Sequence, residues 1–205
     1  IIPIRDNIEL LEYTLNNLRE QDITESANIL VVDDRSKQNI EKLSKESQHS
    51  YLRVDNEKGF NFSMLNNIAA KICHCLGVST IVLWNSDLWC PNKQNFLELL
   101  NRHKNDKSKM SGSKLIYPPE EMSLHETIDT PNIVKYFPSL LGGRWRETVQ
   151  FGGETWIMNQ QAPVQFQPAH YRRFGSFDDK LVDCDRGSLF LTGALQVFEL
   201  QFFID

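Results

Sequence analysis

Residues 58–91, KGFNFSMLNNIAAKICHCLGVSTIVLWNSDLWCP, combine the signals of a loop, a helix and a buried strand. Residues 59–63 have the composition of a loop with Ser63 as a candidate N-cap, and apolar residues then recur at three- and four-residue spacing. Gly77 is expected to end this helix. Residues 79–84 (STIVLW) are short, apolar and β-branched, which is typical of a strand buried on both faces.

Asp87 follows this predicted strand in the sequence Asn85-Ser86-Asp87. Ligands of open α/β sheets bind beyond the carboxyl ends of the strands, and a carboxylate there suits a hard cation such as Mg²⁺ or Mn²⁺. A turn cap before Pro91 is an equally good explanation, because Asp is a favoured turn residue. Asp87 is therefore either a metal ligand or a residue that caps the turn before Pro91.

The bulk composition limits the classes of protein that need to be considered. The chain has 205 residues, of which 40% are hydrophobic and 24% charged, which is enough for one sizeable core. Its net charge of -5 gives no support for a nucleic-acid-binding surface. No run of residues approaches the roughly 18 consecutive apolar residues of a membrane span.

The cysteines do not form the framework of a disulfide-rich or zinc-binding protein. Cys73-His74-Cys75 could suggest zinc, but residues two apart on a helix point to different faces, and no second ligand pair has the usual spacing. Reduced thiols in a cytosolic setting are the simpler interpretation.

The N-terminal part of the chain alternates predicted strands and helices. Asp6 or Asn7 can cap the first helix, and residues 39–47 have the pattern of the second. Such alternation predicts parallel strands joined by right-handed crossovers, and hence a doubly wound α/β domain. The predicted strands end at Ile4, Val32, Val54 and Trp84.

Acidic residues follow two of these strand ends, Asp33 and Asp34 after one and Asp87 after another. Paired acids at the start of a loop often cap a helix. The functional alternative is that one of the pair accepts a hydrogen bond from a base or ribose while Asp87 holds a metal-bound phosphate. Their occurrence together on neighbouring strands favours a nucleotide site.

Several segments together resemble the inverting family-2 glycosyltransferases of GT-A fold, in the bacterial polysaccharide or O-antigen branch. IIPIRDNIELLEYTLNNL resembles the opening strand, turn and helix of that family, and ILVVDDRS resembles its VVDDGS signature. GFNFSMLNNIA resembles its FNFSxxNN segment, and VLWNSDLWCP resembles the LNxD form of its metal motif. No GxGxxG or GxxxxGK[ST] loop competes for the nucleotide.

The resemblance implies a role for each matching position. Asp34 would contact the base, a uracil or other pyrimidine, and Asp87 would bind Mg²⁺ or Mn²⁺ bridging the diphosphate of a nucleotide sugar. The positions implied to bind the donor are Ile4, Arg5, Asp34, Asn61, Asn66 and Ser86. In the segment DCDRGSLFLTGALQVF, the residues implied to lie on the acceptor side are Thr192, Gly193 and Ala194.

Two positions depart from the family pattern. Arg5 stands close to where the family often has Thr or Tyr, and it could contact a phosphate or pair with Asp6. Asn85 occupies the first position of the metal motif in place of Asp, which lowers the charge of the site. This branch of the family tolerates that asparagine.

The second half of the chain carries weaker signals. Residues 112–118 (GSKLIYP) resemble a strand and turn of the family, and His125 follows as a residue that is expected on the surface. Trp145 and Trp156 could stack on an acceptor sugar or could be ordinary core aromatics. The basic residues that could attract a phosphate or form a solvated turn are His170, Arg172 and Arg173.

The general base of the family comes from an acidic motif that has no counterpart in this sequence. Residues 200–205 (LQFFID) resemble the start of the segment before that motif, so the base is expected beyond Asp205. Asp183, Asp185 and Asp205 are nearby acids, but no motif supports them.

The resemblance predicts a single GT-A domain over residues 1–205, with a nucleotide-sugar-binding half (1–92) and an acceptor-side half (93–205). The expected enzyme is a hexosyltransferase-like, metal-dependent inverting glycosyltransferase that uses a UDP- or dTDP-sugar and a saccharide or lipid-linked acceptor. It would work in the cytoplasm, with peripheral association at the cytosolic membrane face. The alternatives are a non-catalytic nucleotide-sugar or glycan-binding module on the same scaffold, and a sugar nucleotidyltransferase, whose glycine-rich loop is missing after the first strand.

Overall fold

The structure is a computed structural model that describes residues 1–106, 108–116, 149–159, 165–171 and 191–205, with single positions between 176 and 188. The chain divides into two compact units, Ile1–Gly112 with Gly193–Asp205, and Ser113–Thr192. The sequence-based division into residues 1–92 and 93–205 stays a prediction.

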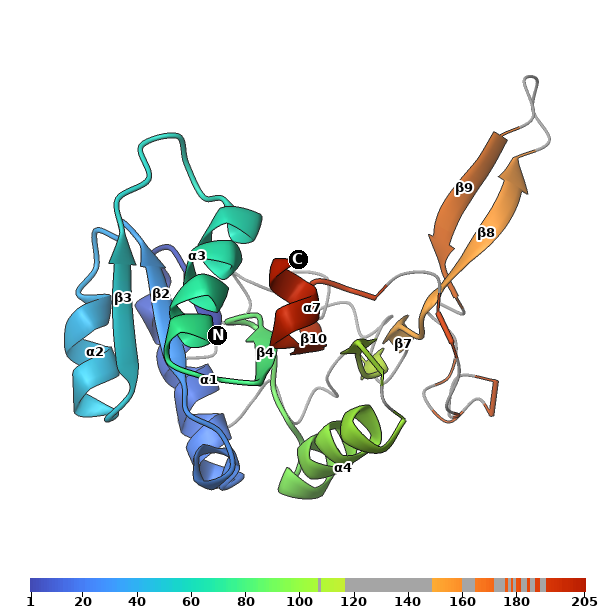
Figure 1. The fold of residues 1–205 in the computed structure, drawn as a ribbon, viewed down its shortest axis with the longest axis horizontal. Helices are drawn as coiled ribbons and strands as arrows, with labels where there is room; N and C mark the ends of the chain where they lie inside the picture. Colours follow the sequence, from blue (N-terminus) through green and yellow to red (C-terminus); the bar gives the residue numbers. More distant parts are fainter. Residues whose placement is uncertain are drawn as a thin grey trace. The chain divides into compact units, whose positions relative to one another are not determined.

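The first unit begins with the predicted alternation of strands and helices (Figure 1). Its elements are β1 (Ile2–Ile4), α1 (Ile8–Glu20), the 3₁₀ turn η1 (Ile23–Glu25), β2 (Leu30–Asp34), α2 (Ile40–Glu46), β3 (Ser50–Val54), α3 (Phe62–Cys75), β4 (Thr80–Trp84), α4 (Lys93–Asn105), β5 (Met110–Ser111), β10 (Leu195–Glu199) and α7 (Leu200–Ile204).

The strands of this unit form a mixed sheet. β1, β2 and β3 pair in parallel, with Ile4 opposite Asp33 and Asp34 opposite Val54. β10 lies between β4 and β5 and runs antiparallel to both. The Ile1 amino group donates to Val82 O (2.8 Å) and the Trp84 N–H donates to Ile1 O (3.0 Å), so β4 continues the sheet beside β1. The predicted α/β fold class is confirmed, and the strand order is β3-β2-β1-β4-β10-β5.

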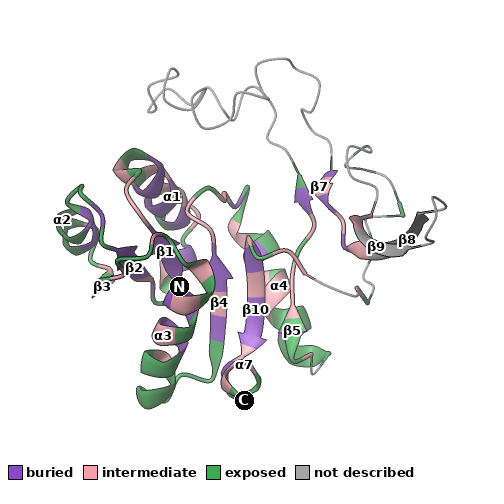
Figure 2. Ribbon diagram, turned by 90° about the horizontal axis from the view of Figure 1, so that it is seen from above, coloured by how far each residue is buried: buried purple, intermediate pink, exposed green. Residues whose placement is uncertain are grey.

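Helices cover both faces of this sheet (Figure 2), with α1 and α2 on one side of β1–β3 and α3 on the other. Leu65 and Ala69 of α3 are fully buried against Val32 of β2. Ala70 extends the same packing to Leu83 of β4, in a cluster that includes the start of α7. These apolar contacts fix α3 over the ends of β1, β2 and β4.

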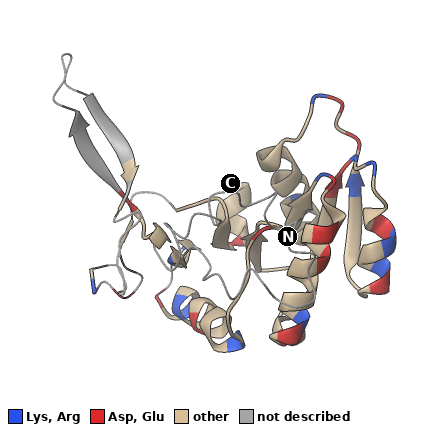
Figure 3. Cartoon of the chain, turned by 180° about the vertical axis from the view of Figure 1, so that it is seen from behind, with Lys and Arg blue, Asp and Glu red and all other residues tan. Residues whose placement is uncertain are grey.

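The outer faces of the helices carry charges of both signs (Figure 3). On α2, Lys45 pairs with Glu41 (2.6 Å) and Lys42 pairs with Glu46 (3.7 Å), both at the four-residue spacing that places side chains together on a helix. These exposed pairs are solvated and indicate no binding surface.

The start of α3 differs from the sequence prediction. Asn61, not Ser63, is the N-cap, and its Oδ1 accepts a hydrogen bond from the Met64 N–H (3.0 Å). Asn7, one of the two residues predicted to cap α1, occupies the N-cap position, but its side chain makes no cap hydrogen bond. Gly77 follows the end of α3 with φ +76°, as expected of a helix-ending glycine.

Replacing Asn61 by alanine is expected to lower the free energy of unfolding by about 1 kcal/mol, because the Met64 N–H loses its cap. Ser63→Ala is the matched control and should change it by less than about 0.5 kcal/mol. Urea unfolding of both variants measures the difference. Equal losses would mean that Asn61 does not act as the cap.

The second unit is described by two antiparallel pairs. β6 (Leu115–Ile116) pairs with β7 (Val149–Phe151), and β8 (Glu154–Asn159) pairs with β9 (Gln165–His170). Trp156 lies in β8 and His170 in β9, but their side chains are outside the described part. The predictions that lie wholly outside the described residues concern His125, Trp145, Arg172, Arg173, Asp183 and Asp185.

Candidate functional site

One edge of the sheet in the first unit gathers several of the predicted site residues. β1 ends there at Ile4, β2 at Asp34 and β4 at Trp84, because parallel strands end at the same edge. The antiparallel β10 starts at this edge, with Leu195 opposite Trp84. In sheets of this kind, the carboxyl edge is where ligands bind.

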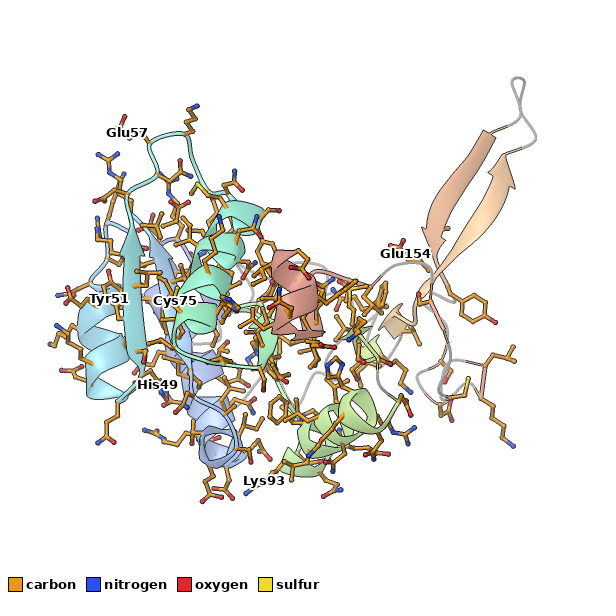
Figure 4. All side chains as sticks on the ribbon, viewed as in Figure 1. His49, Tyr51, Glu57, Cys75, Lys93 and Glu154 are labelled. Carbon is orange, nitrogen blue, oxygen red and sulfur yellow. The ribbon has the colours of Figure 1, made fainter. Side chains whose placement is uncertain are left out.

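Asp33 serves the fold. Its carboxylate is fully buried and accepts from the Ser36 N–H (2.8 Å), the Tyr51 hydroxyl (2.7 Å) and Arg53 Nη1 (3.1 Å). Tyr51 is labelled on β3 in Figure 4, and its burial and this bond raise its pKa to about 12. Asp33 therefore connects β2 to β3 and to its own loop, and both of its oxygens already accept hydrogen bonds from the protein.

Asp34 points to the opposite face, because side chains alternate along a strand. It lies two residues beyond Val32, on the face that Leu65 and Ala69 of α3 cover. The carboxylate is fully buried, yet neither oxygen has a hydrogen-bond partner among the residues that the structure describes. An unsatisfied buried carboxylate is costly, so a ligand that supplies donors is the simplest reason for its presence.

Arg5 is the cation beside Asp34. Its Nη1 lies 3.9 Å from Asp34 Oδ2, which is an ion pair but too long for a hydrogen bond. The side chain is 34% exposed, and a Cβ on Gly59 would lie 3.9 Å from Nη1. Arg5 thus stands between the buried carboxylate and the loop before α3, and its observed ion pair is with Asp34, not with Asp6.

The loops after β1 and β2 hold each other in place. Asp6 Oδ1 accepts from the Lys37 N–H (2.7 Å), while the Asp6 N–H donates to Ser36 Oγ (2.7 Å). Gln38 Oε1 accepts from the Ile8 N–H (2.8 Å) at the start of α1. Sequence reasoning missed this connection, because the partners lie about 30 residues apart and carry no motif.

Three residues beside Arg5 and Asp34 have left-handed backbone conformations without being glycine. The φ angles are 58° at Asp6, 56° at Asn7 and 53° at Arg35. Asp and Asn tolerate this conformation better than other residue types, so the cost falls mainly on Arg35. The hydrogen bonds between the two loops stabilise these backbone conformations directly after Arg5 and Asp34.

Asp87 lies three residues beyond the end of β4, in a turn closed by the Leu88 N–H donating to Asn85 O (3.2 Å). Its side chain is exposed, but the surrounding chain desolvates it enough to raise its pKa. A hydrogen bond from the Asn85 side chain opposes part of that rise. Both side chains offer oxygen atoms, which are the ligands that Mg²⁺ and Mn²⁺ prefer.

Helix α1 anchors this loop from the other face of the sheet. Thr14 Oγ1 donates to Ser86 O (2.6 Å), so Ser86 is held by its backbone. Asn17 both donates to Cys90 O (3.1 Å) and accepts from the Cys90 N–H (2.9 Å). The four bonding residues lie in two segments about 70 positions apart, which fixes where the loop leaves β4.

The predicted acceptor segment adjoins the metal motif. The Asn85 N–H donates to Ala194 O (2.9 Å), and a Cβ on Gly193 would lie 3.7 Å from the ring of Phe62. Gly193 and Ala194 thus lie near both the end of β4 and the start of α3. Thr192 is the last residue of the second unit.

The two predicted asparagines behave differently. Asn61 uses its Oδ1 as the helix cap. Asn66 is 1% exposed and donates to Phe62 O (3.0 Å), whereas its Oδ1 has no hydrogen-bond partner within the described ranges. Asn66 is therefore the second buried polar group, after Asp34, that carries unused hydrogen-bonding capacity near the start of α3.

Among the described residues, no group of three or more His, Cys, Asp or Glu side chains could hold a metal ion. A site with one carboxylate still fits Mg²⁺, which usually takes most of its ligands from substrate phosphates and water. No described helix has the length and apolar character needed to cross a membrane.

Neither a known protein-family model nor a curated protein matches this sequence.

Proposed function

We propose that the chain is a metal-dependent inverting glycosyltransferase of GT-A type that uses a nucleoside-diphosphate sugar. The observation that carries the proposal is Asp34, a fully buried carboxylate with two unused oxygens at the carboxyl edge of a parallel sheet. A nucleotide base offers N–H donors to such a group, and bases bind at this edge in many α/β proteins.

The diphosphate of the donor would lie by the loop after β4. Asp87 and Asn85 are the residues that would hold Mg²⁺ or Mn²⁺ there, and the ion would stabilise the charge of the leaving diphosphate. Arg5 is partly exposed and can compensate negative charge next to the base.

A sugar acceptor would enter beside residues 193 and 194. The Asn85–Ala194 bond joins this segment to the metal motif, so the acceptor hydroxyl and the donor diphosphate would meet at one place. Exposed Gly193 presents backbone without a side chain, which allows a saccharide to approach closely. The acceptor is a saccharide or a lipid-linked saccharide, and peripheral membrane association and a cytoplasmic location remain part of the proposal.

Isothermal titration with nucleoside diphosphates, with and without Mn²⁺, tests this function. We expect one nucleotide to bind at least about tenfold more tightly with Mn²⁺, because Asp87 and Asn85 would hold the ion and the ion would offset the charge of the diphosphate. Release of nucleoside diphosphate from the matching nucleotide sugar then tests transfer. Absence of binding by every nucleotide, in a sample that is folded by circular dichroism, would contradict the proposal. Metal-dependent binding without release would favour the non-catalytic module.

A further inference from the structure

We infer that the base of the donor is guanine, so that Arg5 and Asp34 form a guanine-reading pair; this rests on the proposed function. The resemblance alone predicts a pyrimidine. The hydrogen bonds that Asp34 and Arg5 can still make determine which base is complementary to them.

Asp34 presents two acceptors and no donor. Both oxygens are buried and unsatisfied among the described residues, and an ionised carboxylate only accepts hydrogen bonds. A ligand that donates to one oxygen would leave the other buried without a hydrogen bond, because the Arg5 ion pair at 3.9 Å is too long to be one, and this is unfavourable. The complementary ligand edge therefore carries two adjacent N–H donors.

Arg5 adds a donor next to those acceptors. Its guanidinium carries only donors, and Nη1 is 3.9 Å from Asp34 Oδ2. Asp34 and Arg5 thus present two adjacent hydrogen-bond acceptors, the carboxylate oxygens, followed by one donor, the guanidinium. A complementary base has two adjacent donors followed by one acceptor along one edge.

Among the common bases, guanine has this pattern. Its amino group and ring N1–H are adjacent donors, and its O6 is the acceptor beside them. Uracil and thymine have one N–H between two carbonyl oxygens, so the second oxygen of Asp34 would face a carbonyl. Cytosine and adenine have a single exocyclic amino donor next to a ring nitrogen acceptor.

Access to Asp34 requires a side chain to move. The carboxylate is fully buried without a ligand, while Arg5 is 34% exposed. Arg5 has the Gly59 backbone as a neighbour, and Gly59 is held at φ +98° in a loop where Asn56 Nδ2 donates to Gly59 O. Movement of Arg5 from its ion pair onto O6 of the base would expose both oxygens of Asp34 to the two donors.

The test compares the affinities of GDP, IDP, UDP and dTDP for the whole chain with Mn²⁺. IDP is the sharp control, because its base lacks only the amino group of guanine. We expect GDP to bind at least about tenfold more tightly than each of the others, because each of the others leaves one buried oxygen of Asp34 without a hydrogen bond. Equal affinity for GDP and IDP, or tighter binding of UDP or dTDP, would overturn the inference while leaving the proposed function intact. A blank with every nucleotide would overturn both.

A complementary variant tests the role of Asp34 itself. Asp34→Asn replaces one acceptor by a donor, which matches xanthine, whose second carbonyl replaces the amino group of guanine. We expect the variant to lose at least about tenfold in affinity for GDP and to prefer XDP. A folded variant that still prefers GDP would contradict the assignment. The comparison of GDP with IDP on the unmodified chain does not depend on the variant.

Discussion

Replacing Asp33 by alanine is expected to lower the free energy of unfolding by about 3 kcal/mol, whereas Asp34→Ala should change it by less than about 1 kcal/mol. Asp33 accepts hydrogen bonds from Ser36, Tyr51 and Arg53, and its loss leaves these donors without a buried acceptor. Asp34 has no such bonds among the described residues, so its removal also removes the cost of an unsatisfied carboxylate.

Urea unfolding of the two variants measures this contrast, with each serving as the control for the other. The pair is closely matched, because both residues are fully buried aspartates in the same strand. Equal destabilisation by the two substitutions would show that Asp34 stabilises the fold as much as Asp33 does, and it would remove the main support for a ligand there.

The contrast between these neighbours shows what the sequence could and could not predict. The sequence predicted that the strand ends at Val32 with both acids in the following loop, but β2 continues through Asp34. Which of the two acids is hydrogen-bonded depends on Tyr51 and Arg53, which β3 brings alongside Asp33 in register. No local sequence pattern specifies that register, so residue patterns alone could not decide which of the two acids binds a ligand.

Local sequence patterns predicted which helices and strands exist better than they predicted where these elements end or which strands pair. The helix after residue 61 was expected from its apolar spacing, but the choice between Asn61 and Ser63 as cap depends on the backbone geometry of one residue. The position of β10 between β4 and β5 was not predicted. It joins segments about 85 to 115 residues apart, and no periodicity identifies such a partner.

A substitution in the loop after β4 is expected to have a large effect on nucleotide affinity. Asp87→Asn is expected to abolish the gain in nucleotide affinity that Mn²⁺ provides, a loss of more than about tenfold, because an amide does not carry the charge that holds the ion. Titration of GDP with and without Mn²⁺ measures it. Asp106→Asn is a suitable control, since this exposed residue follows α4 and belongs to no predicted site.

Desolvation raises the pKa of Asp87, and this determines how the Mn²⁺-dependent gain in nucleotide affinity changes with pH. Only the ionised carboxylate binds the cation, so this gain in affinity is complete above the pKa of Asp87 and is lost as the pH falls through it. Because the pKa is raised, the loss should begin at a higher pH than an ordinary aspartate would give.

The same shift predicts how the metal-free protein responds to Asp87→Asn. A raised acid pKa means that the folded state disfavours the ionised form, so the ionised Asp87 lowers stability at neutral pH. At pH 7 the variant should therefore unfold at no lower temperature than the unmodified chain. Any excess of its unfolding temperature over that of the unmodified chain should become smaller as the pH falls. A clear loss of thermal stability at pH 7 would instead mean that the carboxylate serves the turn before Pro91, which is the structural alternative to metal binding.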